Sequence, residues 1–363
     1  MGRHYHRLVV LAACVFVVLA TALGVSAGSG VRISRVAGGS PPTAGKAWVV
    51  KLAVRPRSFH GLVRVVATGS SRLSARARGG HGVYRARLVF PRSGVWKLSA
   101  RAGGSGSKLG SIRVRFSPLT FAEPTGIDVR PDGSLLVVEF GRQRLVRVAP
   151  SSGRITQIAT FTKPWGVALA PSGSIFVSDQ GWLKRIDPGH AATIVATADP
   201  GIEIGPVAVM PGGDVVYSTA WGLYRVAHGR PGTPQQLAPS TAFSGPHGIA
   251  VTSGGALLVS DTGSSVIRRI DPVGGSVTTF ASIGHPRGID VAADGSVYVA
   301  AADEHRIVHL SASGARLGTV GPRFRDAYAL AVAADGTVYA LDVGTPGLIR
   351  RIAPDGTSSV VGR

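Results

Sequence analysis

A six-fold internal repeat in the last two-thirds of the chain constrains the fold more than any other feature of the sequence. Successive copies begin 40, 40, 42, 40 and 41 residues apart, at Thr125, Trp165, Gly205, His247, Arg287 and Tyr328. Each copy opens with an apolar strand and continues through a Gly-containing turn into three further short strands. Four strands in about 40 residues, repeated several times, are the sequence signature of a β-propeller. We therefore predict six blades of four strands each.

The repeated residues follow one pattern. They read Pro-x-Gly-Ile-x-Val, then Asp-Gly-Ser-x-x-Val, then an Asp, then Arg-Ile-x-Arg-Ile, across residues 119–363. This pattern resembles the NHL repeat. Propellers of that kind include protein- and RNA-binding modules, streptogramin lyases and gluconolactonase-like hydrolases. The resemblance therefore implies a six-bladed NHL-type propeller over residues 118–363 and leaves its activity open.

The resemblance also supplies the alternative to a binding protein, a divalent-metal lactonase or a lyase. Gluconolactonase-like propellers hold their metal with Glu, Asp and Asn ligands, and this chain contains no Asn. The carboxylates left to serve as ligands are Glu123, Glu139, Asp179, Glu203, Asp261 and Asp303. Residues 245–251 are similar to the Pro-His-Gly-Ile-Ala-Val segment of the lyases, but the aromatic strand that follows it in that family is absent, and a single His is not a catalytic pair. We predict no cofactor, and a metal only under this alternative.

Residues 28–117 show about seven short runs in which apolar and polar residues alternate, separated by breaks rich in Gly and Pro. The segment 84–90 is the clearest of these runs. So many short strands in so few residues predict a β-sandwich. Residues 84–100 resemble a hairpin of secreted immunoglobulin-like domains. The predicted fold class is all-β, with an N-terminal immunoglobulin-like β-sandwich followed by a six-bladed β-propeller.

The net charge of +21 is concentrated in the N-terminal third. Residues 1–117 hold 20 of the 40 Lys and Arg residues and none of the 19 acids, the first of which is Glu123. GC-rich codon usage explains why Arg replaces Lys, but it does not explain a domain without acids. We predict that this domain contacts an anionic cell-wall polymer or membrane surface, and we expect no nucleic acid as a partner of an exported protein. The candidate polyanion-binding residues are Arg55, Arg57, Arg72, Arg76, Arg78, Arg85 and Arg87.

The first 27 residues have the composition of a signal peptide. Arg3 and Arg7 precede an apolar run over residues 8–25, and small residues end at Ala27, where we predict cleavage. Two alternatives remain open at this point, a lipid attached at Cys14 and retention of residues 8–25 as a membrane anchor. Cys14 is the only cysteine, so disulfides do not stabilise the exported part. We therefore expect a secreted protein, either free or associated with the cell wall or membrane.

Distinctive side chains gather in two sets of propeller loops, those before strand one and those after strand two, which share one face. They are Glu123, Glu139, Trp165, Asp179, Trp182, Glu203, Trp221, His247, Asp261, His285, Arg287, Asp303 and Tyr328. The acids that end strand two have a structural alternative, because they can cap a turn or pair with a basic residue of strand three. The recurring basic residue of strand three is likewise explained as a cross-strand pair. His305 and His309 lie too far apart along a strand, at about 13 Å, to share a metal.

The function that the sequence favours is therefore a non-catalytic recognition protein that acts as a monomer. Its propeller face would bind a glycan or protein ligand, and its basic domain would contact an anionic surface polymer.

Overall fold

The structure is a computed structural model that describes residues 31–36 and 39–362. The predicted signal peptide lies outside these residues. The chain divides into two compact units, with the boundary between Arg115 and Phe116. Within the described part, no helix has the length and apolar character that a membrane span requires.

The N-terminal unit is a seven-stranded antiparallel sheet with the strand order β1-β2-β5-β4-β3-β6-β7. Strand β4 pairs with β3 through residues 72–77 and with β5 through residues 78–80, so it joins the two halves of the sheet. The strands are β1 (Arg32–Arg35), β2 (Ala47–Arg55), β3 (Val63–Thr68), β4 (Arg72–Gly80), β5 (Val83–Val89), β6 (Gly94–Ala102) and β7 (Ser105–Val114).

Alternation along these strands creates a single core. In β5, for example, Tyr84, Ala86 and Leu88 are buried while Arg85 and Arg87 are exposed. Apolar residues from both halves of the sheet belong to one buried cluster, in which Trp96 packs edge-on against Phe90. The two halves thus enclose the same core and turn their charged sides outward.

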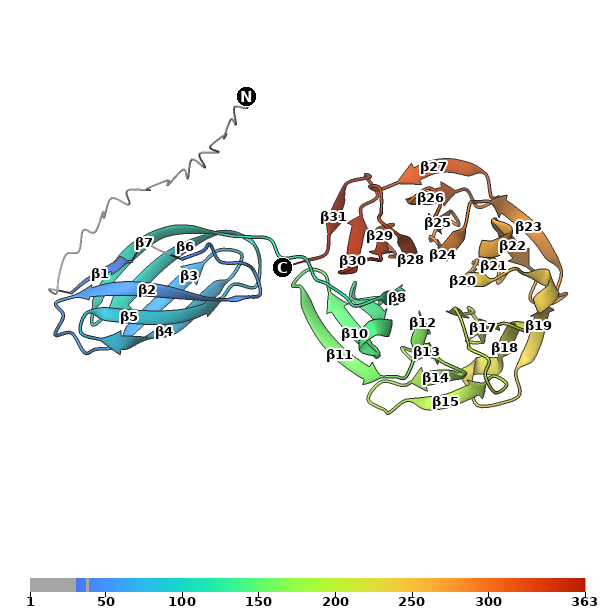
Figure 1. Ribbon diagram of the computed structural model, residues 1–363, viewed down its shortest axis with the longest axis horizontal. Coiled ribbons are helices and arrows are strands. Elements are labelled where there is room, and N and C mark those ends of the chain that lie inside the picture. Colours follow the sequence, from blue (N-terminus) through green and yellow to red (C-terminus); the bar gives the residue numbers. More distant parts are fainter. Residues whose placement is uncertain (1–30, 37–38, 363) are drawn as a thin grey trace, which may run out of the picture. The chain divides into compact units, whose positions relative to one another are not determined.

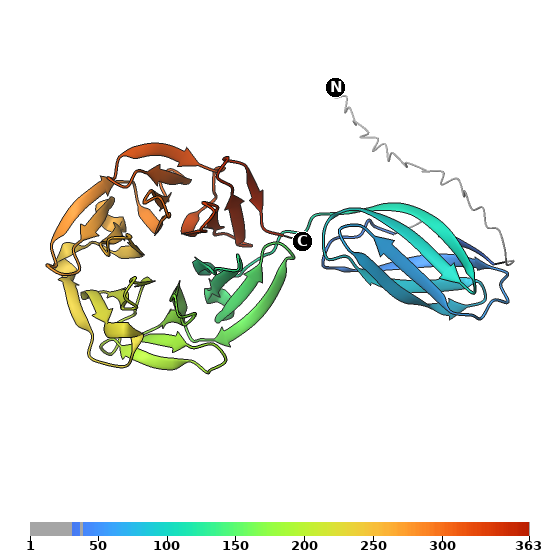
Figure 2. The same ribbon diagram turned by 180° about the vertical axis from the view of Figure 1, so that it is seen from behind.

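The second unit is a ring of six separate four-stranded sheets, which confirms the predicted six-bladed propeller (Figure 1 and Figure 2). Blade 1 contains β8 (Pro124–Val129), β9 (Leu135–Glu139), β10 (Arg144–Ala149) and β11 (Arg154–Thr160). Blade 2 contains β12 (Pro164–Leu169), β13 (Ile175–Asp179), β14 (Trp182–Ile186) and β15 (Thr193–Thr197). Blade 3 contains β16 (Val207–Val209), β17 (Val215–Thr219), β18 (Gly222–Val226) and β19 (Gln235–Pro239). Blade 4 contains β20 (Pro246–Val251), β21 (Leu257–Asp261), β22 (Val266–Ile270) and β23 (Val277–Ser282). Blade 5 contains β24 (Pro286–Val291), β25 (Val297–Ala301), β26 (Arg306–Leu310) and β27 (Arg316–Val320). Blade 6 contains β28 (Ala327–Val332), β29 (Val338–Asp342), β30 (Leu348–Ile352) and β31 (Ser358–Val360). In the described part of the chain there are also four short 3₁₀ turns, η1 (Phe140–Arg142), η2 (Ala227–Gly229), η3 (Ser240–Ala242) and η4 (Thr262–Ser264).

Glycines allow the innermost strands of neighbouring blades to approach one another closely. A Cβ on Gly248 would lie 2.4 Å from the carbonyl oxygen of Arg287 in the next blade. A Cβ on Gly288 would lie 2.5 Å from the Cα of Ala329. Any larger residue at these positions would force the blades apart, which explains why the second residue of most copies is Gly or Ala.

The recurring basic residue of strand three contacts groups of its own blade. Arg147 pairs with Asp132, and Arg185 lies 2.8 Å from Asp187. In blade 5 the position is His309, whose ring stacks at 4.4 Å on Tyr298, its directly opposite neighbour on β25. These contacts agree with a structural role for the recurring basic residue of strand three.

The ring is closed by the segment that precedes blade 1. Phe121 and Gly347 exchange two backbone hydrogen bonds of 3.0 Å, and the Leu119 amide donates to the Val361 carbonyl at 3.0 Å. Leu119 and Phe121 are buried in a core cluster that contains residues of blades 1 and 6. The first and last blades are therefore joined by apolar packing and by backbone pairing.

Candidate functional site

Three aromatic side chains from alternate blades meet on the face that carries the loops before strand one. Trp165, His247 and Tyr328 are each the second residue of the innermost strand of blades 2, 4 and 6. The ring centroids of His247 and Tyr328 are 4.8 Å apart, and the Trp165 ring lies 5.8 Å from His247 and 6.0 Å from Tyr328. Phe140 adds a fourth ring, 6.4 Å from Trp165. We call these four residues the aromatic mouth.

The electrostatics of the aromatic mouth favour uncharged rings. Burial, followed by repulsion from Arg287, lowers the pKa of His247 to about 4, so this imidazole is neutral at physiological pH. Burial also raises the pKa of Tyr328 far above its ordinary value. The Arg287 guanidinium lies 5.2 Å above the Tyr328 ring and donates to Asp326 at 2.6 Å. Its charge is therefore held at the edge of the group.

The aromatic mouth borders a hollow of about 450 Å³. Its apolar lining includes Phe140, Trp165, Ile204 and two prolines, while Lys163, Gln180, Glu203, Ser218 and Thr219 supply polar groups. An aromatic wall with a few polar groups is the usual composition of a small-molecule site. We call it the first hollow.

A second hollow of about 430 Å³ lies beside the first and is lined by Trp182. Both hollows share Lys163, Gln180 and Glu203. Lys163 donates to Glu203 at 3.2 Å, so this exposed ion pair stands between the two spaces. Trp221 is 52% exposed and is not among the residues that line either hollow.

The acids that end strand two in four of the blades are fully buried, namely Glu139, Asp179, Asp261 and Asp342. Each accepts a hydrogen bond from a backbone N–H of the loop before strand one, as Asp179 does from Lys163 at 2.7 Å. Each also pairs with a basic residue of strand three, as Asp342 does with Arg350 at 2.6 Å. Their oxygens therefore fasten loop to blade, and we assign these acids a structural role.

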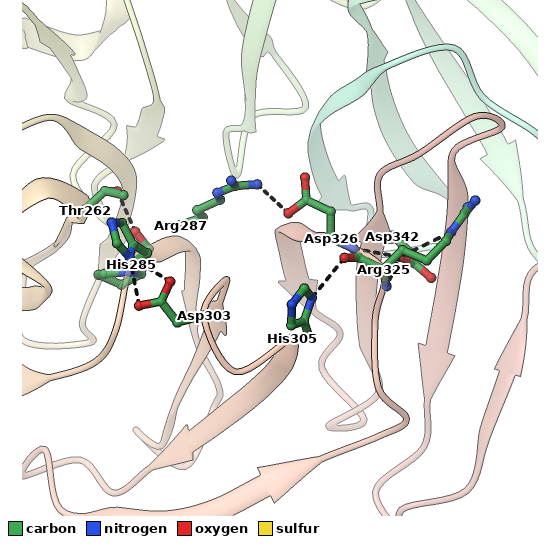
Figure 3. Close-up of polar contacts among 9 residues, drawn as sticks. Thr262, His285, Arg287, Asp303, His305, Arg325, Asp326 and Asp342 are labelled. Carbon is green, nitrogen blue, oxygen red and sulfur yellow. Dashed lines mark hydrogen bonds and ion pairs between the residues drawn. The ribbon is translucent and has the colours of Figure 1, made fainter.

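Blade 5 departs from this arrangement, since Ala301 replaces the buried acid. The exposed carboxylate of Asp303 lies 2.7 Å from the Nδ1 atom of His285. Figure 3 shows these two side chains pointing toward each other. His285 has a left-handed backbone conformation with φ of +40°, at the repeat position that Gly245 occupies in blade 4. Such a conformation disfavours a residue with a Cβ, so blade 5 tolerates local strain in presenting this imidazole.

The His285–Asp303 pair borders a polar hollow of about 680 Å³ that also contains Arg287, His305 and Arg325. The Nδ1 atom of His305 lies 2.9 Å from the Arg325 carbonyl, which can only accept, so this nitrogen carries the proton (Figure 3). An ionised Asp303 fixes the proton of His285 on Nδ1 in the same way. The Nε2 atoms of both histidines are then left with free lone pairs.

Two further carboxyl groups, Asp128 and Asp290, lie in the innermost strands near the turns between strands one and two. The Asp128 carboxylate accepts from the Leu169 amide of blade 2 at 2.7 Å, and Asp290 accepts from the Val332 amide of blade 6 at 2.7 Å. Burial and then repulsion by Asp290 raise the pKa of Asp128 to about 7, and burial raises that of Asp290 to about 6. Neither residue was among those predicted from the sequence, although Ala fills this position in the other four blades and both acids therefore stand out.

The residues present do not fit the divalent metal that the alternative requires. Among residues 31–36 and 39–362, no three His, Cys, Asp or Glu side chains lie close enough together to hold a metal ion. The strand-two acids are already engaged within their blades, and Glu203 and Asp303 pair with Lys163 and His285. Glu123 is exposed and has a φ of +45°. We derive no metal-dependent step.

Of the thirteen residues predicted for this face, the structure thus brings Trp165, His247, Arg287 and Tyr328 together. It places Glu203, Trp182 and the His285–Asp303 pair in neighbouring hollows. The remaining five lie apart from these contacts, three of them as buried acids, Glu123 and Trp221 as exposed side chains. Phe140 and the Lys163–Glu203 pairing were missed, because neither stands out without knowledge of which loops are neighbours.

Comparison with known proteins agrees with the propeller. The NHL repeat matches residues 243–269, and no curated protein matches the chain. Among solved structures, the chain is similar to virginiamycin B lyase from Staphylococcus aureus, with 17% identity, a TM-score of 0.53 and coverage of 68% of this chain and 87% of that chain.

Two other solved structures extend this likeness. A gluconolactonase from Xanthomonas campestris shares 16% identity and a TM-score of 0.55, with coverage of 64% of this chain and 86% of that chain. A Bacteroides thetaiotaomicron protein of unknown function shares 13% identity and a TM-score of 0.57, with coverage of 88% of this chain and 98% of that chain. At these identities the likeness shows the fold alone.

Proposed function

We propose that this chain is an exported, non-catalytic recognition protein whose propeller binds a glycan at the aromatic mouth. The observation that carries the proposal is the convergence of Trp165, His247 and Tyr328 from three blades beside the first hollow. Aromatic rings with one polar edge suit a ligand that has both an apolar face and hydroxyl groups. A sugar ring has this character.

Charge supports an uncharged sugar. His247 is neutral above a pH of about 4, and the Lys163–Glu203 pair cancels its own charge. Polar side chains that line the hollow, such as Gln180, can exchange hydrogen bonds with hydroxyls. The hollow therefore offers stacking and hydrogen bonding without a dominant charge.

The test is a screen of the purified protein on a glycan array, followed by titration calorimetry of the best ligand. Trp165→Ala should weaken binding by about 10- to 100-fold, as expected for a central aromatic anchor. Trp221→Ala is the matched control, because this tryptophan lies outside both hollows. Absence of any glycan ligand, or an equal loss in both variants, would contradict the proposal.

For the N-terminal unit we propose an immunoglobulin-like sandwich that attaches the protein to an anionic cell-surface polymer. Its strand order, β1-β2-β5-β4 continuing into β3-β6-β7, matches strands ABED and CFG of the immunoglobulin fold. Its freedom from acids supports the attachment role. Export itself rests on the composition of residues 1–27.

One observation favours a second candidate function, a lyase or hydrolase centred on His285. Asp303 orients the imidazole, and the free Nε2 can accept a proton from a substrate or from water. Arg287 borders the same hollow and could stabilise a developing negative charge. Turnover of the streptogramin quinupristin or of a lactone panel, abolished in His285→Ala and retained in Trp165→Ala, would establish this candidate in place of the first.

A further inference from the structure

Cationic side chains of the N-terminal unit lie directly opposite one another across its strands. On β5, Arg85 faces Arg78 of β4 on one side and Lys51 of β2 on the other. On β3, Arg64 faces Arg76 of β4 and Arg101 of β6. All six side chains are exposed.

The two rows are continuous. Arg76 and Arg78 are two residues apart on β4, and Ala77 between them is buried, so both arginines point outward on the same side of the strand. The resulting line of six cations crosses β2, β5, β4, β3 and β6 at right angles to the strands. We call it the basic track. Only Arg76, Arg78 and Arg85 of this track were selected from the sequence.

The basic track costs stability in the free protein. Like charges directly opposite one another destabilise an antiparallel strand pair. Four such pairs occur here, and no Asp or Glu precedes Glu123 in the sequence to offset them. A partner that carries the missing negative charge would remove this repulsion. The arrangement is therefore better suited to a bound polyanion than to a bare surface.

The path of the basic track indicates the shape of that partner. Neighbouring strands are about 4.8 Å apart, so five strands present a line of charge about 20 Å long. The two halves of the sheet enclose one core and turn their outer sides away from each other, and β4 belongs to both halves. The track consequently bends around β4. A flat membrane can touch only one of the two sides, whereas a flexible chain can follow the bend.

We propose that the basic track binds a flexible, linear polymer that carries a phosphate in each repeat. Five of its six residues are arginines, whose planar guanidinium groups form paired hydrogen bonds with phosphate oxygens. This inference rests on the proposed attachment role and specifies the class of polymer, the residues that bind it and its course across the strands.

The experiment measures binding of the purified protein to labelled long-chain inorganic polyphosphate by fluorescence anisotropy, at several salt concentrations. Six phosphate contacts should give a log–log salt slope of about −4, by analogy with single-stranded nucleic acid. Arg85→Gln and Arg64→Gln, one in each row, should each weaken binding by roughly 5- to 10-fold and make the slope less steep by about one. Arg113→Gln is the matched control, because this exposed arginine of β7 faces Val95 and lies off the track.

A second readout separates binding from general charge. Without polyphosphate, Arg85→Gln should unfold at a slightly higher temperature than the wild type, because two repulsive pairs are lost. With polyphosphate the order should reverse. Equal weakening by Arg113→Gln would overturn the track, since only overall charge would then matter. Binding to phosphatidylglycerol vesicles without binding to polyphosphate would also contradict the proposed polymer, while leaving attachment to an anionic surface intact. Absence of binding to both probes would contradict the attachment role as well.

Discussion

The two carboxyl groups of the innermost strands, Asp128 and Asp290, make the stability of the propeller depend on pH in an unusual direction. Both have raised pKa values in the folded protein, about 7 and about 6, against 3.8 for an ordinary Asp. Between these values the folded state holds more protons than the unfolded state. The stabilisation they provide is therefore complete below pH 3.8 and is lost as the pH rises through 6 and 7.

The magnitude follows from the pKa shifts. One pKa unit corresponds to about 1.4 kcal/mol, so shifts of about three and two units set ceilings of about 4 and 3 kcal/mol. Asp128 lines a hollow of about 880 Å³ that is open to solvent, and solvent screening reduces the effect of its charge. We therefore expect the pair to cost about 2–4 kcal/mol at pH 8 relative to pH 4.

The perturbation is Asp128→Ala combined with Asp290→Ala, which gives these blades the residue that Ala168, Ala208, Ala250 and Ala331 supply in the others. At pH 4 the variant should be less stable than the wild type by about 1–2 kcal/mol, because the Leu169 and Val332 amides lose their acceptors. At pH 8 it should be the more stable protein.

The assay is a urea titration at pH 4, 6 and 8, in which tryptophan fluorescence reports unfolding. Glu123→Ala, a change at an exposed acid, is the control variant. His247 acts in the opposite direction between pH 4 and 6.5, because its pKa is lowered, so the difference between variant and wild type is the informative quantity. A difference that does not change with pH would refute the reasoning.

Three further predictions concern the propeller. Asp342→Ala removes the ion-pair partner of Arg350 and the acceptor of the Arg325 amide, and should lower the free energy of unfolding by about 3 kcal/mol in urea titrations. The exposed Asp355→Ala should change it by less than about 1 kcal/mol, and equal effects would contradict the structural role of the buried acids. Glu203→Gln should change the free energy of unfolding by less than about 1 kcal/mol in the same titrations, because the Lys163–Glu203 pair is exposed. It should alter glycan affinity in calorimetry, because the pair separates the two hollows. A large loss of stability would contradict this prediction. The protein should not hydrolyse a panel of lactones in the presence of calcium, and turnover that Glu139→Gln or Asp179→Asn abolishes would restore the metal alternative.

The sequence was sufficient to predict the blades because the repeat is periodic and each copy carries its own turn and strand signals. Gly248 and Gly288 were informative for a local reason, since each allows close approach of the neighbouring blade. Contacts between side chains of different copies could not be predicted in this way. That Trp165, His247 and Tyr328 touch one another depends on the diameter of the ring, which no single copy encodes.

The buried acids illustrate the second limit of the sequence. Asp179 and Asp303 both lie near the end of strand two of their blades, and both were candidate ligand-binding residues. Asp179 is withdrawn from solvent by two backbone amides and Lys184, whereas Asp303 stays exposed beside His285. The difference arises from their positions in the repeat, because Asp179 is the last residue of β13, whereas Ala301 ends β25 and Asp303 lies two residues beyond it. Which of these two positions is buried cannot be read from a single copy.

The closure of the ring has a consequence for the order in which the protein can mature. Leu119 and Phe121 are made before blade 1, yet the buried cluster that contains them also includes Ile349 and Val361 of the last blade. During translation these apolar side chains are not fully covered until about 240 further residues have been made. A chain truncated anywhere in blade 6 would therefore leave these apolar side chains exposed instead of forming a smaller closed ring. We expect late truncations to be degraded as readily as early ones.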